Sequence, residues 1–281
     1  MVLSHLPLNR DVDYAICRQP LIHGKIIFGA LGFEKYSLET RHKILAVLEE
    51  NNIREIDTAL AANGAPARFT IDTKASGFHS GALSKSSVLT GAKKSLDSLG
   101  TQQVDAYFLP SPDPDTALEE TLGAIQELLE GECLFGKSMI FMAAKVHVLP
   151  TVFRGNYNAV VHSYESELFP LLHKLGIKFY AYSPIAGGFL VKSSEALKTG
   201  IQGGRWDKDS PIGEMYLGLY SRPKLLAALD EAGVTKAALA YRWVVFSSAL
   251  DPKYDDGVII GATKVEQLQE SLKALEDVGG H

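Results

Sequence analysis

Short apolar segments alternate with amphipathic helical segments along most of this chain. KIIFGA (residues 25–30) has the composition of a buried strand, and residues 38–52 follow it with Ile44, Leu45 and Leu48 on one face of a helix. The same pair of patterns recurs towards the C-terminus. The predicted strands are residues 25–30, 54–59, 69–75, 103–110, 133–138, 151–157, 177–184 and 257–262. The predicted helices are residues 38–52, 84–100, 116–131, 165–176, 235–248 and 264–277.

This alternation predicts an α/β fold with a parallel sheet, because each strand is followed by a segment that can cross back over the sheet. Eight such units favour a (β/α)8 TIM barrel over an open doubly wound sheet. With 281 residues, 46% of them hydrophobic, the chain can bury one substantial core. We therefore expect a single domain over residues 1–281, in which residues 1–23 form an N-terminal arm or cap.

Composition argues against several classes of partner. The formal net charge is −5 and no run is rich in Lys or Arg, so neither nucleic acid nor an anionic membrane is an expected partner. No apolar run reaches the ~20 residues that cross a membrane, and the N-terminus has no recognisable signal peptide. Cys17 and Cys133 have neither metal-ligand spacing nor the density of a disulfide framework. We expect a cytoplasmic protein without a metal site.

Charged residues stand at the ends of two neighbouring predicted strands. Asp57 ends the second strand and Lys74 ends the third, and in barrels of this class the site is built from the carboxyl ends of the strands and the loops that follow. Each residue also has a purely structural interpretation, since an Asp can cap a turn and a Lys can keep its charge in water. The other segments at this end are Pro110–Asp113, Gly136–Met139, Arg154, Tyr182–Gly188 and Gly261–Lys264.

The order of several motifs is similar to that of the aldo-keto reductases, and most similar to the fungal branch related to aflatoxin-aldehyde reductases. The resemblance covers residues 25 to 277. It rests on IIFGALGF, IDTA, TIDTKASGF, QVDAYFLPSPDPDTALEETL, LPTVFRGNYNAV, ESELFPLLHKLGIKFYAYSPIAGGFL, GGRWD, AYRWVVFSSAL and VIIGATKVEQLQESL. It implies a barrel that reduces a small-molecule aldehyde or ketone with hydride from NADPH.

In that family a Tyr donates the proton, a Lys and an Asp lower its pKa, and a His orients the carbonyl. The need is physical, because an unperturbed Tyr titrates near ~10. The resemblance makes Asp57 the Asp and Lys74 the Lys. No Tyr occurs between Ile56 and Lys74, and the His position is Pro110, whose side chain offers no donor or acceptor. The sequence therefore keeps half of the tetrad.

Other segments are shorter than in the family. Only Thr58 to Arg68 remain for the crossover after the second strand, where about a dozen residues are needed. The segment after the fifth strand is also short, with Ser138 at the family's Ser and Met139 in place of its Asn. Residues 225–236 are shortened too, and the chain ends at residue 281, which predicts a truncated C-terminus.

The cofactor contacts are expected to be better preserved. Tyr182 matches the aromatic residue that stacks on the nicotinamide, and Arg154 stands where the family has a Gln under the nicotinamide. The same resemblance makes Arg205 a candidate contact of the pyrophosphate. The start of the last helix is an anion site through its dipole and free amides, which favours NADP over NAD. The full set of candidate cofactor contacts is Asp57, Ser138, Arg154, Tyr182, Ser183, Pro184, Ile185, Ala186, Gly187, Gly188, Leu190, Arg205, Thr263, Lys264 and Gln267.

The sequence is compatible with three functions. The first is an NADP-dependent carbonyl reductase of fungal secondary metabolism, such as polyketide or terpenoid tailoring. The second is an impaired or inactive relative, and the third is a cofactor-binding regulatory protein or an enzyme without hydride transfer. His79 and Tyr157 could in principle replace the missing groups, but a loop His is typically solvated and NYNA favours packing for Tyr157. The substrate and the oligomeric state are not predicted.

Overall fold

The computed structural model describes residues 25–58, 69–130, 135–139, 150–193 and 235–276, with short pieces at 195–196, 201, 206–207, 209, 213–214, 217–218 and 231. Eight parallel strands form one sheet. They are β1 (Lys25–Gly29), β2 (Glu55–Asp57), β3 (Thr70–Lys74), β4 (Val104–Phe108), β5 (Phe135–Met139), β6 (Val152–Asn156), β7 (Lys178–Tyr182) and β8 (Gly257–Ile260).

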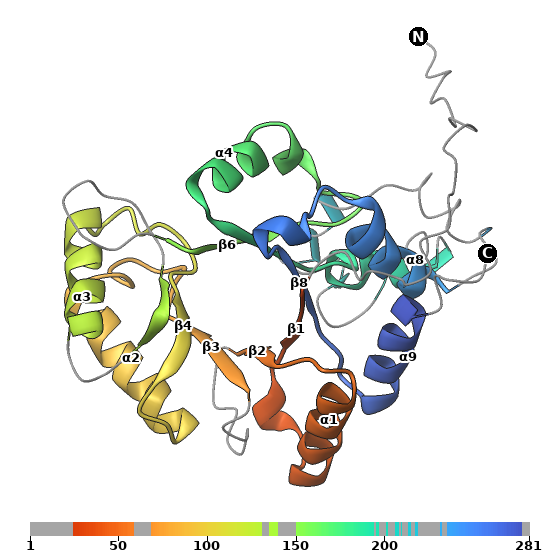
Figure 1. Ribbon diagram of the computed structural model, residues 1–281, viewed down its shortest axis with the longest axis horizontal. Coiled ribbons are helices and arrows are strands. Elements are labelled where there is room, and N and C mark those ends of the chain that lie inside the picture. The colour runs from red at the N-terminus through yellow and green to blue at the C-terminus, as the bar shows by residue number, and fades with distance from the viewer. Residues whose placement is uncertain are drawn as a thin grey trace.

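The strand order is β5-β4-β3-β2-β1-β8-β7-β6, so consecutive strands lie side by side from β1 to β5 and from β6 to β8, and β8 pairs with β1. The sheet curls around a centre with the helices outside it (Figure 1). Among the described residues no ladder joins β5 to β6. The predicted α/β class and parallel sheet are therefore confirmed, while closure into a full (β/α)8 barrel stays a prediction.

The helices begin and end close to the predicted positions because their caps are encoded locally. Ser37 accepts a hydrogen bond from the Thr40 amide before α1, and Ser84 accepts one from the Ser87 amide before α2. Gly100 ends α2 in the left-handed region, at φ 64°. The helices are α1 (Leu38–Glu50), α2 (Lys85–Leu99), α3 (Leu118–Glu130), α4 (Leu168–Leu175), α8 (Lys236–Arg242, continued by a π turn over Trp243–Ser247) and α9 (Val265–Glu276).

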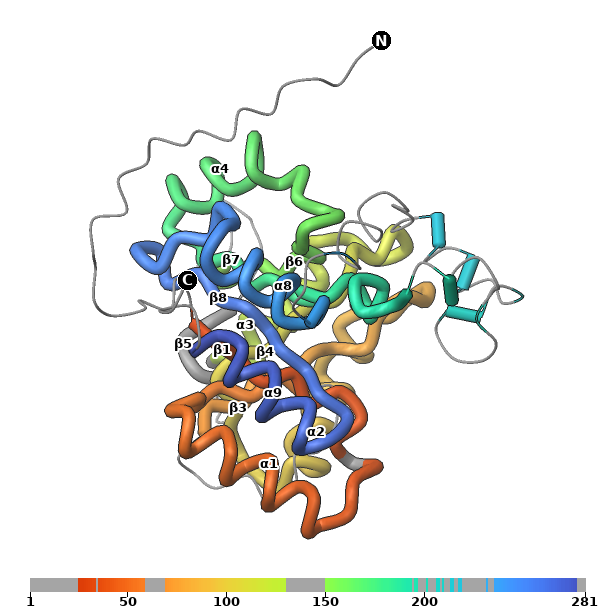
Figure 2. Tube along the Cα trace, turned by 90° about the vertical axis from the view of Figure 1, so that its right-hand side faces the viewer, coloured from red at the N-terminus to blue at the C-terminus, as the bar shows by residue number. Residues whose placement is uncertain are grey.

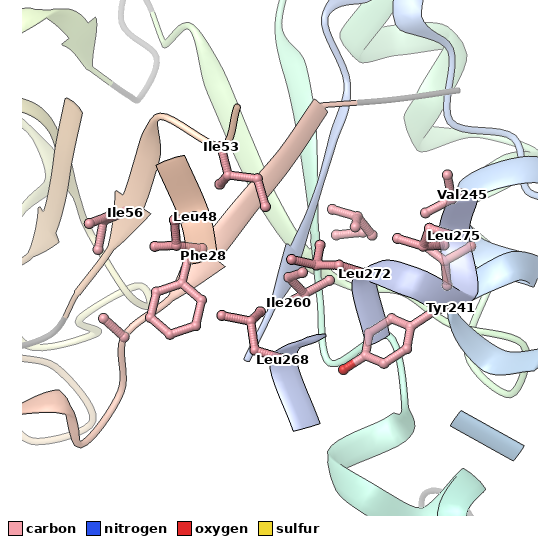
Figure 3. Close-up of a cluster of buried hydrophobic side chains, with 14 of the residues drawn as sticks. Phe28, Leu48, Ile53, Ile56, Tyr241, Val245, Ile260, Leu268, Leu272 and Leu275 are labelled. Atoms are coloured by element: carbon pink, nitrogen blue, oxygen red, sulfur yellow. The ribbon is translucent and has the colours of Figure 1, made fainter. Parts of the chain in front are cut away.

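Two apolar layers bury the outer face of the sheet. The larger joins β1, β2 and β8 to α1, α8 and α9, and α1 and α9 lie side by side (Figure 2). Its labelled members in Figure 3 are Phe28, Leu48, Ile53, Ile56, Tyr241, Val245, Ile260, Leu268, Leu272 and Leu275. The second layer packs α2 and α3 on β3 and β4. Burial of these faces is the main driving force that holds the helices on the sheet.

A third cluster lies on the inner face and shows how strongly the sheet curls. Its members come from five strands, including β4 and β6, which are far apart in the strand order. Side chains of β4 and β6 can meet only if the sheet bends around them. The members are Ile27, Ala106, Phe108, Val152, Tyr180 and Ile259.

The short crossover after β2 still returns the chain in register. Glu55, Ile56 and Asp57 pair with Thr70, Ile71 and Asp72, although residues 59–68 lie outside the described residues. Ile56 is buried in the larger outer layer. The crossover is therefore long enough for β2 and β3 to pair along the whole of β2.

Within the described part of the chain, no helix is both long and apolar enough to cross a membrane.

Replacing Gly155 by Ala is expected to destabilise the protein by about 1–3 kcal/mol, because it overpacks a filled aromatic cluster. A Cβ at Gly155 in β6 would lie 2.4 Å from Cζ of Phe179 and 3.1 Å from Cε2 of Tyr164. Chemical denaturation measures the change. Gly123→Ala in α3 is the control, since a Cβ there meets nothing within 4 Å and Ala favours a helix. Equal stabilities for the two variants would contradict the packing argument.

Candidate functional site

Three charged side chains meet on the inner face, near the carboxyl ends of the strands. Asp57 is the last residue of β2, Lys74 the last of β3, and Arg154 the middle residue of β6. The Lys74 Nζ lies 3.5 Å from Oδ1 of Asp57. The sequence predicted that Asp57 and Lys74 would come together, and the parallel register of β2 with β3 brings this about.

Arg154 reaches Asp57 from the opposite side of the curled sheet. Its Nη1 donates to Oδ1 of Asp57 at 2.8 Å and its Nη2 donates to Oδ2, which makes a bidentate ion pair. The guanidinium also lies over the ring of Phe108, 4.5 Å from the ring centre. The exposed fractions of the Asp57 and Arg154 side chains are 9% and 14%. Sequence reasoning assigned Arg154 to the nicotinamide and did not predict this pair, although a charge in the middle of a buried strand requires a partner.

The surroundings of Lys74 favour its neutral form. Burial lowers the pKa of the Lys74 ammonium, the Asp57 carboxylate opposes this effect, and the Arg154 guanidinium lowers the pKa further. In the ladder with β4, Lys74 is paired with Phe108. The Arg154 guanidinium, which lies over the Phe108 ring, is therefore a second cation near the amine.

A second polar group lies one layer further towards the amino ends of the strands, and sequence reasoning missed it. Lys25 of β1 forms an ion pair with Glu55 of β2 and donates to the Tyr180 hydroxyl at 3.2 Å. Burial raises the pKa of the Asp72 carboxyl well above its ordinary value, and the Glu55 charge adds to the effect. This shift favours the protonated form of Asp72. The signal in the sequence was the spacing of two between Glu55 and Asp57 and between Asp72 and Lys74, which places each pair on one face of a strand.

The residues considered as replacements for the family's Tyr and His lie elsewhere. The Tyr157 hydroxyl donates to Oε1 of Glu165 at 2.6 Å and accepts from the Ala249 amide at 3.0 Å, inside the larger outer layer. This confirms that Tyr157 serves packing. His79 is exposed in the loop after β3, and Pro110 follows β4, where it leaves no room for a Cβ at Gly77. No described contact brings any of the three to Asp57 or Lys74.

The loop after β7 has an unusual backbone. Ser183 and Ala186 have φ values of 56° and 52°, and Gly187 and Gly188 follow at 63° and 95°. Left-handed angles at two non-glycine residues are strained, and such strain is found most often at functional sites. The Trp206 Nε1 donates to the Gly187 carbonyl at 2.9 Å and holds the turn.

The side chains of this loop divide into two groups. Tyr182 is 41% exposed at the end of β7, whereas Ala186 and Leu190 are buried with Phe189 and Trp206. Pro184 is also buried, and Ser183 and Ile185 are intermediate. Of the predicted contacts in this loop, Ala186, Pro184 and Leu190 can therefore reach a ligand through the backbone and not through the side chain.

At the start of α9, Thr263 and Gln267 bond to each other. The Oε1 of Gln267 accepts from the Thr263 amide at 3.2 Å and from the Thr263 hydroxyl at 2.8 Å, next to the exposed Lys264. Arg205 lies outside the described residues. Ser138 lies in β5, where only the backbone is described. Within the described part of the chain, no group of three or more His, Cys, Asp or Glu side chains could hold a metal ion.

Comparison with known proteins gives concordant matches. The model of the Aldo/keto reductase family matches residues 25–278. The chain is similar to oxidoreductase sirO of Leptosphaeria maculans, with 35% identity over 87% of this chain and 83% of that protein. It is also similar to aflatoxin B1 aldehyde reductase member 2 of Homo sapiens, with 34% identity over 78% of this chain and 67% of that protein. Aldo-keto reductase pigE of Monascus ruber is 28% identical over 69% of this chain and 64% of that protein.

Proposed function

The chain belongs to the aldo/keto reductase family, and on that premise we propose that it is an NADP-dependent oxidoreductase that reduces a small aldehyde or ketone. The family assignment made from the sequence motifs is confirmed. The observation that carries the proposal is the contact between Asp57 and Lys74 at the carboxyl ends of β2 and β3. The relatives sirO of Leptosphaeria maculans and pigE of Monascus ruber are fungal proteins, and the proposal extends to a role in fungal secondary metabolism.

The proposal includes a full (β/α)8 barrel as a single domain, with the site at the carboxyl end of the strands. The family match spans nearly the whole described chain, and the strand order needs only a β5–β6 ladder to close. We also propose that the protein is located in the cytoplasm and has neither nucleic acid nor a membrane as its partner.

The described residues fit the phosphate-bearing part of NADP. Lys264 and the free amides at the start of α9 can hold a phosphate, because a helix N-terminus attracts anions. The strained loop over Ser183–Gly188 presents backbone close to the Tyr182 ring, which can stack on a planar group. When bound, the cofactor supplies the hydride. Ser138 and Arg205 remain candidate contacts in this proposal.

The nicotinamide side fits less well. Arg154 stands where the family has a Gln, and its bidentate bond to Asp57 fixes the guanidinium, so only the N–H groups turned away from Asp57 remain for a carboxamide. Proton donation is also weakened, since the family's Tyr has no counterpart between residues 56 and 74. Loss of a general acid slows a reaction by about 10²–10⁴-fold, so we expect a slow reductase.

A second candidate function is cofactor binding without turnover, in an impaired or regulatory relative. The Arg154–Asp57 pair favours it, because this pair occupies the carboxylate that would otherwise tune a proton donor. The two functions differ in one respect: both predict NADPH binding, and only the reductase predicts consumption of NADPH with an aldehyde.

We expect NADPH to raise the melting temperature by about 5 °C at a concentration near 100 Kd, because a ligand of the native state adds about 2.7 kcal/mol there. NADH is expected to give a smaller shift. Lys264→Gln should abolish the difference between NADPH and NADH. Lys273→Gln, at the other end of α9, should preserve it.

These measurements separate the candidates. A shift together with NADPH oxidation on an aldehyde panel supports the reductase. A shift without oxidation supports the cofactor-binding relative, and no shift with either nucleotide overturns both.

A further inference from the structure

The charges around Asp57 do not balance. One carboxylate faces two cations, the Arg154 guanidinium and the Lys74 ammonium. Both oxygens of Asp57 already accept from Arg154, whose Nη1 lies 2.8 Å from Oδ1. Asp72, the carboxyl of β3, has a raised pKa, which weakens the negative charge that it offers to Lys74. The group loses its excess positive charge if Lys74 releases a proton.

Lys74 is weakly held in its charged form. An ammonium has three donors, and in the part of the chain that the structure describes the Nζ of Lys74 has one partner, Oδ1 of Asp57 at 3.5 Å. That distance is longer than a good hydrogen bond of this kind. The Lys74 side chain is nevertheless 26% exposed, so a small molecule can reach it from the carboxyl end of the strands.

Lys25 provides a comparison within the same sheet. It is also a partly buried inner-face lysine beside a β2 carboxylate, with an exposed fraction of 35%. Its Nζ forms a close ion pair with Glu55 and donates to Tyr180, and it has no neighbouring guanidinium among its described contacts. Of these two lysines, Lys74 is the one that combines a shared carboxylate with an adjacent cation.

We propose that Lys74 is a nucleophilic amine that captures an aldehyde as an imine, with Arg154 as the residue that keeps it reactive. A lysine beside another cation and away from water is the arrangement that activates an amine for this chemistry. The proposal rests on the proposed function only for the choice of an aldehyde. It needs no nicotinamide.

The reaction balances without an oxidant or reductant. The neutral Nζ lone pair attacks the carbonyl carbon, a C–N bond forms, and the C=O electron pair moves to oxygen, which takes a proton. The resulting carbinolamine loses water, and the nitrogen lone pair forms the C=N bond. Nζ gives up its two protons over the two steps, and the overall change is amine plus aldehyde to imine plus water. Asp57 can carry a proton between nitrogen and oxygen.

The test traps the imine in the full-length protein without NADPH. Benzaldehyde and cyanoborohydride convert an imine to a stable benzylated lysine, which peptide mapping by mass spectrometry locates. We expect Lys74 to be labelled first and Lys25 to remain unlabelled under the same conditions. Because both lysines are read in one wild-type sample, the comparison does not depend on how any variant folds.

Two variants probe the cause. Lys74→Arg keeps the charge and should lose the label at this position. Arg154→Gln frees Asp57 for Lys74 and should reduce labelling of Lys74, by about tenfold for each unit by which its pKa recovers. Asp57, Asp72 and Arg154 are the charged or titratable groups that face the amine from β2, β3 and β6.

The pH profile gives a second readout. Labelling of Lys74 should rise with pH and level off below the ~10.4 midpoint of an ordinary lysine, because its pKa is lowered. Label spread over exposed lysines with Lys74 unmodified overturns the proposal, as does unchanged labelling in Arg154→Gln. Neither result bears on whether NADPH binds or is oxidised, so the proposed function is judged separately.

Discussion

Asp57→Asn is expected to lower the free energy of unfolding by about 3–5 kcal/mol, since it leaves the largely buried Arg154 guanidinium without its carboxylate. The side chain of Arg154 is 14% exposed and bonded through both Nη atoms to Asp57, so water cannot replace the lost partner without rearrangement. Guanidinium chloride denaturation in the absence of nucleotide measures the change. A loss below about 1 kcal/mol would contradict burial of the pair.

A double-mutant cycle identifies the cause of this loss. Arg154→Gln alone should be milder than Asp57→Asn, because Lys74 stays beside Asp57 at 3.5 Å. The double variant Asp57→Asn/Arg154→Gln should recover part of the stability, since an amide pair needs no compensating charge. Glu39→Gln is the surface control. It breaks the exposed pair with Lys43 and should leave stability unchanged within error.

Restoring a tyrosine to the crossover after β2 is expected to raise aldehyde reduction by about 10²–10⁴-fold, the usual contribution of a general acid. The natural crossover is replaced between residues 60 and 68 by a longer one that contains Tyr followed by Gly, in an Arg154→Gln background. Lys74 and Asp57 are then placed to lower the Tyr pKa, because a nearby ammonium favours the phenolate. NADPH consumption gives kcat/KM.

The matched control is the same crossover with Phe in place of Tyr. It keeps the length and packing of the new segment and removes only the hydroxyl. Lys74→Met in the Tyr variant should return the rate to that of the Phe variant. If the Tyr and Phe variants reduce aldehydes equally fast, proton donation is not what this chain lacks, and misalignment on the nicotinamide side becomes the explanation.

The family assignment and the position of the site both depend on order along the chain. The motifs from IIFGALGF to VIIGATKVEQLQESL identify the family, and the family match over residues 25–278 confirms it. Asp57 and Lys74 could be placed together because neighbouring parallel strands end at the same edge of a sheet. The missing members of the tetrad could also be identified, since Pro110 stands at the His position and no Tyr occurs between Ile56 and Lys74.

The part of the site that was not predicted lies across the sheet. Arg154 is 97 residues from Asp57 in the sequence, and Lys25 is 155 residues from Tyr180. The periodicity of apolar residues indicates which face of a strand or helix a residue occupies. It does not indicate which distant strand will lie opposite that residue. These pairs could be identified only from the tertiary structure.

The sequence by itself determined the α/β class, the parallel order of the strands, the family, and the meeting of Asp57 with Lys74. The family follows from the resemblance of its motifs, and the rest follows from local periodicity, caps and neighbouring strand ends. Only the tertiary structure decided that Arg154 takes both oxygens of Asp57 and leaves Lys74 as the less tightly held cation. The physical reason is curvature: the bend of the sheet brings β6 across to β2, and a buried carboxylate then binds the cation with the best geometry within reach.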